Sequence, residues 1–470
     1  MKIRVENLAN IKESDIEVKN LTLFVGQNST HKSYMAHTVY ELYKEISSIK
    51  NNWNKKNRLI SIISKNLLLK YEKEISEILL LEKDMSEEIE QYEYDEDHIE
   101  TEIFTTIRIK IDKNKSFQVL QEKAINLVLQ ELRNIINSSF NSPNSIIEKI
   151  FLENLNFHNE NENEYIIIKF NIPLEHFVEE KEDLSSRIVN STVSKIMAKF
   201  EKLLVNHQTA YYFPASRTGF VLTLDEIYAG IFRDKFRGQV SATRLGEPTI
   251  DFIQTFADIK TGKQSEWNPF SFDLVDNKEE SIIKELTSFL ETNIIKGKIK
   301  EKRNEQNYKS YFLGVNNKEI DLHLASSATL ETLPFIVFIK NTDKISKTLF
   351  VIEEPEAHLH PKAQIQMAKF LVLLSNCGAK VVVTTHSDYI LNEINNCIKL
   401  NSVDADKESK RFAIDKENVS AYLFKNNTLE TTVNRLEIDK FGISNENFDE
   451  VLNELLDRSS ELSEKILENE

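Results

Sequence analysis

Hydrophobic and polar positions along the first 45 residues predict strands that lead into a loop and then a helix. Residues 3–5 and 16–18 alternate between apolar and charged side chains, and a period of two is typical of a strand with one face in a core. The run LTLFV at 21–25 predicts a buried strand. A glycine turn follows, and helical periodicity then predicts a helix that opens at Lys32 or Ser33.

A second apolar pattern predicts a parallel strand–helix–strand unit near the C-terminal end. The runs LFVIE at 349–353 and KVVVTT at 380–385 are strand-like. The segment AQIQMAKFLVLLSN between them has helical periodicity, and Cys377-Gly378 stops the helix. Parallel neighbours require a crossover of this length, so we predict an α/β fold.

The middle of the chain differs in character and predicts an insertion. It is rich in Asn, Lys, Glu and Ile. Helical periodicity covers 57–90, 117–138 and 183–206, strand-like runs cover 102–111 and 164–172, and an acidic, exposed connection is predicted at 91–102. These patterns indicate a mostly helical segment with a small sheet.

We therefore predict four parts along the chain. They are the N-terminal part of an α/β head at 1–45, the insertion at 46–205, the C-terminal part of the head at 206–430, and a helical tail at 431–470. Within the second part of the head we expect a helix over 277–297, β-rich segments around 308–324 and a strand at 419–425.

Composition is that of a soluble globular protein. The chain has 470 residues, of which 40% are hydrophobic and 29% charged. No apolar run approaches the roughly 20 residues of a membrane span, and the N-terminus lacks the apolar stretch of a signal peptide. Cys377 and Cys397 are the only cysteines, which excludes a disulfide framework and predicts a reducing, cytoplasmic location.

The formal charge of −16 argues against a broad nucleic-acid surface, because such a surface needs clustered Lys and Arg. Two local clusters of basic residues keep a local basic groove as an alternative. They are Arg233, Lys235 and Arg237, and Lys296, Lys298, Lys300, Lys302 and Arg303. We favour a solvated loop or helix face for each cluster.

The segment GQNSTHKS is a candidate phosphate-binding loop. Gly26, Lys32 and Ser33 match the pattern G-x-x-x-x-G-K-[ST], whereas His31 replaces the second glycine. The match alone is also what a coincidental loop would give, but the strand before it and the helix after it favour nucleotide binding. The predicted nucleotide contacts in this loop are Gly26, Asn28, Ser29, Thr30, His31, Lys32 and Ser33.

Two carboxylates and a histidine end the apolar runs. We predict that Glu353 lies on the Mg²⁺ side together with Ser33, that Glu354 is the general base, and that His386 contacts the γ-phosphate. The alternative is a pair of exposed carboxylates and a structural histidine.

Four further features each allow more than one interpretation. Ser326 and Ser327 open an apolar helix, and they either cap a core helix or bind the phosphate of an opposite subunit. Arg217 either contacts phosphate or pairs with an acid, and we weigh this evenly against a structural salt bridge. His358 with His360 suggests a zinc site, but no cysteine cluster or third ligand is nearby, so we reject this as first choice. Asp404 with Asp406 suggests a metal site of a nuclease, but the pair lies in the polar stretch SVDADKES, for which we favour a solvated loop.

The opening segment resembles that of the ABC-type AAA ATPases of the OLD, RecF and SMC-like group. So do YYFPASRTGF, LASSATLETLPF, FVIEEPEAHLHP and VVVTTHSDYIL, in this order. The resemblance implies an ABC-type P-loop ATPase head, which binds ATP and Mg²⁺ in a head-to-tail dimer, and it does not extend to the insertion. The predicted fold is α/β, with this head, the mainly helical α+β insertion and the helical C-terminal tail that the patterns above indicate. On this resemblance Ser326 and Ser327 are signature residues and Pro355 to Leu359 the D-loop, whereas Ala328 and His31 depart from glycine.

We expect no C-terminal TOPRIM domain of the kind that OLD nucleases carry, and stand-alone relatives resemble ATPase subunits of antiphage systems. We therefore predict a sensor or regulatory ATPase that responds to a phage-derived trigger and controls a separately encoded nuclease or toxin. The alternatives are a non-hydrolysing ATP-dependent scaffold or sensor, favoured by His31 and Ala328, and a DNA-repair or chromosome-associated ATPase.

Overall fold

The structure is a computed structural model of the 470-residue chain. It describes residues 1–51, 53–70, 83–95, 98–110, 209–224, 245–262, 277–305, 309–316, 318–427 and 430–444, with shorter stretches within 123–194 and at 457–462. These residues divide into two compact units, formed by 1–43, 136–148 and 206–470, and by 44–135 and 149–205.

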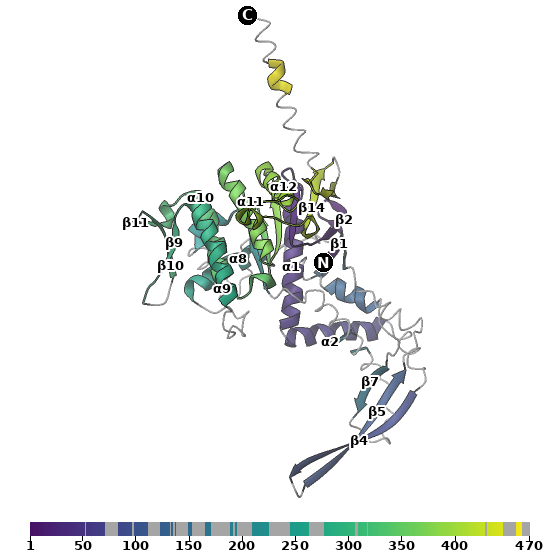
Figure 1. Ribbon diagram of the computed structural model, residues 1–470. Coiled ribbons are helices and arrows are strands. Elements are labelled where there is room, and N and C mark those ends of the chain that lie inside the picture. Colours follow the sequence, from purple (N-terminus) through teal and green to yellow (C-terminus); the bar gives the residue numbers. More distant parts are fainter. Residues whose placement is uncertain are drawn as a thin grey trace, which may run out of the picture. The chain divides into compact units, whose positions relative to one another are not determined.

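A large mixed sheet forms the centre of the first unit (Figure 1). Within that unit its strand order is β1-β2-β15-β14-β3-β13-β12-β8. The strands are β1 (Lys2–Leu8), β2 (Ile11–Glu17), β3 (Leu21–Gly26), β8 (Thr209–Phe213), β12 (Thr348–Glu353), β13 (Lys380–Thr385), β14 (Val419–Asn426) and β15 (Thr431–Arg435). From β14 to β8 all neighbours are parallel, whereas β1–β2 and β14–β15 are antiparallel. The predicted α/β fold is therefore confirmed.

Helices cover this sheet, and their ends follow local sequence rules. They are α1 (Lys32–Asn51), α6 (Arg217–Leu222), α8 (Glu247–Thr261), α9 (Asn277–Leu290), α10 (Ser327–Lys340), α11 (Pro361–Asn376), α12 (Asp388–Leu400) and α13 (Lys407–Lys410). Proline is the first residue of α11, and Gly378 follows its end with a φ of +91°. Both placements suit the backbone preferences of these residues, and the predicted stop at Cys377-Gly378 is confirmed.

The core of the first unit is an aromatic cluster between β8, α8, α10 and β12. Phe213 stacks on Phe335 with ring centroids 4.7 Å apart, and Phe252 stacks on Phe338 at 5.5 Å. Every residue from Thr329 to Ile339 in α10 is buried. A helix that is apolar all round belongs in an interior, so α10 cannot be moved without repacking the core that supports the sheet.

A smaller antiparallel sheet belongs to the same unit and corrects one prediction. It consists of β9 (Lys298–Arg303), β10 (Lys309–Val315) and β11 (Lys318–Asp321), and β9 follows a π-helical turn at Glu291–Ile295. Four residues of the basic cluster predicted on a loop or helix face, Lys298, Lys300, Lys302 and Arg303, therefore lie on a strand, whereas Lys296 caps the π-helical turn. The side chains of this cluster are exposed, and Lys300 and Lys302 both pair with Glu319 across the sheet. Arg233, Lys235 and Arg237 lie outside the described residues.

The second unit contains α2 (Trp53–Lys70), β4 (Lys83–Asp95), β5 (His98–Lys110), β6 (Lys149–Leu152) and β7 (Tyr165–Phe170). The predicted strands at 102–111 and 164–172 are confirmed by β5 and β7. The predicted helix over 57–90 is wrong beyond Lys70 in the described residues, because 83–90 belong to β4. The predicted exposed connection at 91–102 is wrong as well: β4 and β5 form a hairpin in which Asp95 pairs with His98.

The predicted helical tail begins with strands. After β15 come β16 (Ile438–Asp439) and β17 (Gly442–Ile443), so residues 431–443 are β-structured, and Asn395 of α12 holds the last strand through hydrogen bonds to Ile443. Residues 457–462 are helical, and the rest of the tail lies outside the described residues. Short 3₁₀ turns lie at Leu322–Leu324, Ile345–Lys347 and Lys416–Asn418. No helix among the described residues is both long and apolar enough to cross a membrane.

Candidate functional site

The candidate site lies where four neighbouring parallel strands end. Strands β3, β13, β12 and β8 are adjacent and point the same way, so their carboxyl ends share one edge of the sheet. That edge is where ligands bind in open α/β sheets. Gly26, Glu353, His386 and Pro214 end or follow these strands, so the topology brings together the segments that the sequence singled out.

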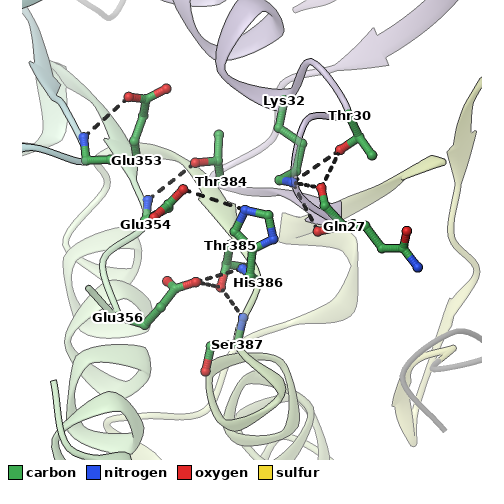
Figure 2. Close-up of polar contacts among 12 residues, drawn as sticks. Gln27, Thr30, Lys32, Glu353, Glu354, Glu356, Thr384, Thr385, His386 and Ser387 are labelled. Atoms are coloured by element: carbon green, nitrogen blue, oxygen red, sulfur yellow. Dashed lines mark hydrogen bonds and ion pairs between the residues drawn. The ribbon is translucent and has the colours of Figure 1, made fainter. Parts of the chain in front are cut away.

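Lys32 closes the loop that follows β3. Its ammonium donates to the carbonyl of Gly26 at 3.0 Å, to that of Gln27 at 2.7 Å and to the hydroxyl of Thr30 at 3.2 Å (Figure 2). Burial lowers the pKa of Lys32 to about 8, although Glu354 and Glu356 oppose the shift. A phosphate group placed in the loop would offer this ammonium a stronger acceptor than the loop carbonyls.

Two residues of this loop adopt a backbone conformation that favours glycine. Ser29 has a φ of +61° and His31 a φ of +64°. For residues with a side chain this region costs roughly 1–2 kcal/mol each. Asn28 and Ser29 are exposed, and His31 is partly buried. The departure at His31 thus leaves the loop in a glycine-like shape, at an energetic cost that other contacts must offset.

Glu353 ends β12 as a buried carboxylate. Its Oε2 accepts a hydrogen bond from the backbone N–H of Ala215 at 3.3 Å. Burial raises the pKa of Glu353, and the hydroxyls of Ser33 and Tyr212 lower it in part. Its Oε1 is buried and makes no hydrogen bond among the described residues.

That unpaired oxygen fits a cation. No group of three or more acidic, His or Cys side chains within the described part of the chain could hold a metal by itself. Mg²⁺ is commonly held by one or two protein oxygens together with substrate phosphates and water. Ser33 and Glu353 therefore fit Mg²⁺ only alongside a phosphate ligand.

Glu354 faces His386 across the end of the sheet. Its Oε1 lies 3.6 Å from Nε2 of His386 (Figure 2), and this contact with the imidazole lowers the pKa of Glu354. The backbone of Glu354 has a φ of +41°, and its N–H donates to the carbonyl of Thr384 at 2.9 Å. A strained residue that is fixed by neighbouring strands is typical of functional sites.

Glu356 is a member of this cluster to which the sequence analysis gave no role beyond its place in the D-loop segment Pro355 to Leu359. Its carboxylate accepts hydrogen bonds from the Thr385 hydroxyl at 2.8 Å and from the His386 backbone N–H at 2.7 Å (Figure 2). It therefore fixes the backbone that carries the histidine. A third carboxylate in the run EEPE was the available indication, but nothing local shows that it turns toward β13.

Arg217 makes the contacts that the salt-bridge interpretation predicts. Its side chain is fully buried, and its Nε lies 2.8 Å from the carboxylate of Glu331 on α10. The guanidinium also donates to the carbonyls of Glu353 at 2.8 Å and Glu354 at 3.0 Å. Arg217 thus ties α10 to the backbone of both carboxylates.

The two serines predicted to bind phosphate lie at the start of α10. Both are exposed, and Ser326 caps the helix by accepting from the backbone N–H of Thr329. Capping and phosphate binding are compatible, because the Ser327 hydroxyl and the helix N-terminus still face solvent. The described structure brings the loop, the carboxylates and His386 together and sets the serines on a separate helix end.

The two motifs rejected as metal sites have other partners. His360 caps α11 by accepting from the backbone N–H of Lys362, and His358 lies 3.9 Å from Glu331. Asp406 is exposed and caps α13 by accepting from two backbone N–H groups.

Comparisons with known proteins agree with this geometry at the level of the family. Residues 1–391 match a family model described as an AAA ATPase domain. A search of curated proteins found no match.

Solved structures of SMC heads are similar at low identity. One, bound to the C-terminal winged-helix domain of ScpA, has 9% identity and a TM-score of 0.35, with 93% of this chain and 98% of that chain covered. The SMC head domain from Thermotoga maritima has 10% identity and a TM-score of 0.30, with 93% and 98% covered. A head with an extended coiled coil from Pyrococcus furiosus, bound to the C-terminal domain of ScpA, has 12% identity and a TM-score of 0.30, with 97% and 98% covered. At these scores the fold assignment depends on the family match and the strand order.

Proposed function

The chain belongs to the family of AAA ATPase domains, and we propose that it binds ATP and hydrolyses it at the site of Lys32, Glu354 and His386. The observation that carries this proposal is the pairing of Glu354 with His386 at 3.6 Å, at the sheet edge where the loop of Lys32 also lies. Residues Gly26 to Ser33 would surround the phosphates at the N-terminus of α1, where backbone N–H groups and the helix dipole favour an anion.

Glu354, Ser33 and Glu353 would have different roles in the transfer of the γ-phosphoryl group to water. The water oxygen bonds to the γ-phosphorus, the bond to the bridging oxygen breaks, and ADP leaves. Glu354 takes the proton of the water, and its lowered pKa keeps it a carboxylate at neutral pH. A weak base suffices because this transition state is loose and depends mainly on positioning. Ser33 and Glu353 would hold Mg²⁺, which neutralises phosphate charge when bound.

We test the activity by measuring ATP binding and turnover on the full chain. Glu354→Gln should retain ATP binding and lose turnover, and Lys32→Ala should lose affinity because it removes the phosphate-binding ammonium. Glu280→Gln, on an exposed position of α9, is the matched control and should equal the wild type. Equal turnover in Glu354→Gln and the wild type would refute the assignment.

A non-hydrolysing ATP-dependent scaffold or sensor is the second candidate. His31 and Ala328 favour it, because both stand where the ATPase pattern has glycine, and the φ of +64° at His31 costs a residue with a side chain roughly 1–2 kcal/mol. ATP binding by the wild type without turnover, unchanged by Glu354→Gln, would favour this candidate.

We further propose that ATP is bound between two copies of the chain in a head-to-tail dimer. Ser326 and Ser327 support this, because they are exposed at the N-terminus of a 14-residue helix and remain open to a ligand of another copy. Glu354→Gln with ATP should sediment as a dimer, and adding Ser327→Arg should return it to monomer. Residues 46–205 would be an insertion into this ATPase head.

The biological setting that we propose is antiphage defence in the cytoplasm. The ATPase would respond to a phage-derived trigger and control a separately encoded nuclease or toxin; the order of its sequence motifs supports this. Phage plaque counts on cells that carry the gene with its neighbours should rise for Glu354→Gln.

A DNA-repair or chromosome-associated role is the alternative, and the net charge of −16 weighs against it. DNA binding that survives moderate salt would favour that alternative.

A further inference from the structure

The loop that we propose to bind ATP is contacted on one side by the hairpin of β14 and β15. At Gly26, a β-carbon would lie 2.2 Å from the carbonyl oxygen of Phe424, so the two backbones are in direct contact. At Ser29, the carbonyl accepts from the side-chain amide of Asn426 at 3.0 Å. At His31, Nδ1 lies 2.9 Å from the hydroxyl of Thr431. The hairpin thus touches both positive-φ residues of the loop.

The directions of these hydrogen bonds follow from one fixed acceptor. The carbonyl of Ser29 can only accept, so the nitrogen of the Asn426 amide faces it and the Asn426 oxygen faces away. That oxygen accepts from the Thr431 hydroxyl at 2.7 Å. The hydroxyl has one proton, so it accepts from His31, which assigns the proton to Nδ1 of the imidazole. The result is one chain from His31 through Thr431 and Asn426 back to Ser29.

The hairpin end of this chain is itself anchored. Thr431 is buried, its backbone N–H donates to the carbonyl of Asn10 at 2.9 Å, and it pairs with Ile11 of β2. On the loop side, the His31 ring also packs edge-on against Tyr34, with centroids 5.5 Å apart. The hydrogen bond at Nδ1 and the ring contact with Tyr34 together hold the imidazole, so the backbone of His31 is held as well.

We propose that Asn426 and Thr431 are positioning residues for nucleotide binding, which hold Ser29 and His31 in the backbone conformation that glycine adopts without cost. This inference rests on the proposed function, because it assumes that residues 26–33 bind ATP. Each residue acts through the loop and contacts no substrate. A loop with glycine at 31 would need this support less than the loop present here.

The test is a thermodynamic cycle on the full chain. ATP affinity is measured by calorimetry for Thr431→Val, Thr431→Ser, His31→Gly and the double variant His31→Gly/Thr431→Val. Thr431→Val removes the hydroxyl at nearly constant volume and should weaken ATP binding roughly five- to tenfold. Thr431→Ser keeps the hydroxyl and should stay within about twofold of the wild type. In the His31→Gly background, Thr431→Val should weaken ATP binding clearly less than in the wild type, because only the link from Thr431 through Asn426 to Ser29 remains to be lost.

Hydrogen exchange of the backbone amides of residues 27–32, without nucleotide, separates this inference from the proposed function. Thr431→Val should speed that exchange, and Thr431→Ser should not. Wild-type ATP affinity in Thr431→Val, or the same loss with histidine and with glycine at 31, would overturn the inference. If the wild type does not bind ATP, the proposed function is wrong. Faster exchange in Thr431→Val would then show only that Thr431 supports the loop backbone, without a role in nucleotide binding.

Discussion

Arg217 and Glu331 form a buried ion pair, with Nε 2.8 Å from the carboxylate and at most 1% of either side chain exposed. Burial lowers the pKa of Arg217, and Glu331 is the largest opposing influence. The same guanidinium donates to the carbonyl of Glu354, whose φ of +41° is strained, and the Glu354 N–H is held by Thr384. The general base that we propose is therefore fixed at both of its backbone polar groups.

Arg217→Ala should destabilise the fold and disturb the site. It leaves the buried carboxylate of Glu331 without the guanidinium that lies 2.8 Å away, and breaking a buried pair in this way costs roughly 3–5 kcal/mol. The measurement is thermal unfolding together with ATP turnover at a temperature where the variant is folded. Arg217→Lys keeps the positive charge but cannot reach the Glu331 carboxylate and the carbonyls of Glu353 and Glu354 at once. This variant should therefore lose much of its turnover while its melting temperature changes less than that of Arg217→Ala. Wild-type unfolding of Arg217→Ala would contradict the structure.

Gly26→Ala should disrupt the loop because of a backbone clash. The added β-carbon would lie 2.2 Å from the Phe424 carbonyl, and the φ of Gly26 is +145°. We expect a lower melting temperature and loss of ATP binding. Gly219→Ala is the control: nothing lies within 4 Å of its β-carbon position in α6, so it should be neutral or slightly stabilising. Equal effects of the two substitutions would contradict this account.

ATP affinity should fall as pH rises above about 8. Burial lowers the pKa of Lys32 to about 8 in the free protein, so its ammonium loses its proton near that pH. Bound phosphates stabilise the ammonium and so raise the pKa of Lys32 in the complex. Above about pH 8, ATP binding therefore takes up a proton, and the affinity falls by up to tenfold per pH unit. Calorimetry between about pH 7 and about pH 9.5 in buffers of different ionisation enthalpy measures both effects.

Lys32→Arg is the control for this pH dependence. Guanidinium stays protonated throughout this range, so the variant should show a flat profile whatever its absolute affinity. A wild-type profile that is also flat would mean that Lys32 keeps its proton in the free protein.

His386→Ala should reduce turnover more than binding. His386 pairs with Glu354 at 3.6 Å and would contact the γ-phosphate, a small part of the nucleotide surface. We expect roughly a hundredfold loss in kcat and a change in ATP Kd of only a few fold. Single-turnover hydrolysis and equilibrium binding measure the two quantities. Glu356→Ala, which frees the backbone of His386, should give a smaller loss of the same kind; a larger loss in affinity than in kcat would rule out this role for the histidine.

The parts of the fold that could be predicted were those with a one-dimensional pattern. Buried parallel strands are apolar along their length, and β3, β12 and β13 have that pattern together with the polar residues that follow them. The segment 83–95 has apolar side chains at both helical and strand spacings, and only its pairing with β5 made it a strand. The strand β9 was missed because its run of lysines faces solvent in a small sheet.

The sequence by itself determined the chemical groups of this protein and the strand ends on which they lie: a lysine after β3, two carboxylates at the end of β12 and a histidine after β13. Only the tertiary structure decided their partners. Arg217 meets Glu331 across 114 residues, and His31 meets Thr431 across 400. Such contacts depend on the order in which strands join the sheet and on which helix packs against them. That order is set by the packing of the whole core, and no local pattern of residues records it.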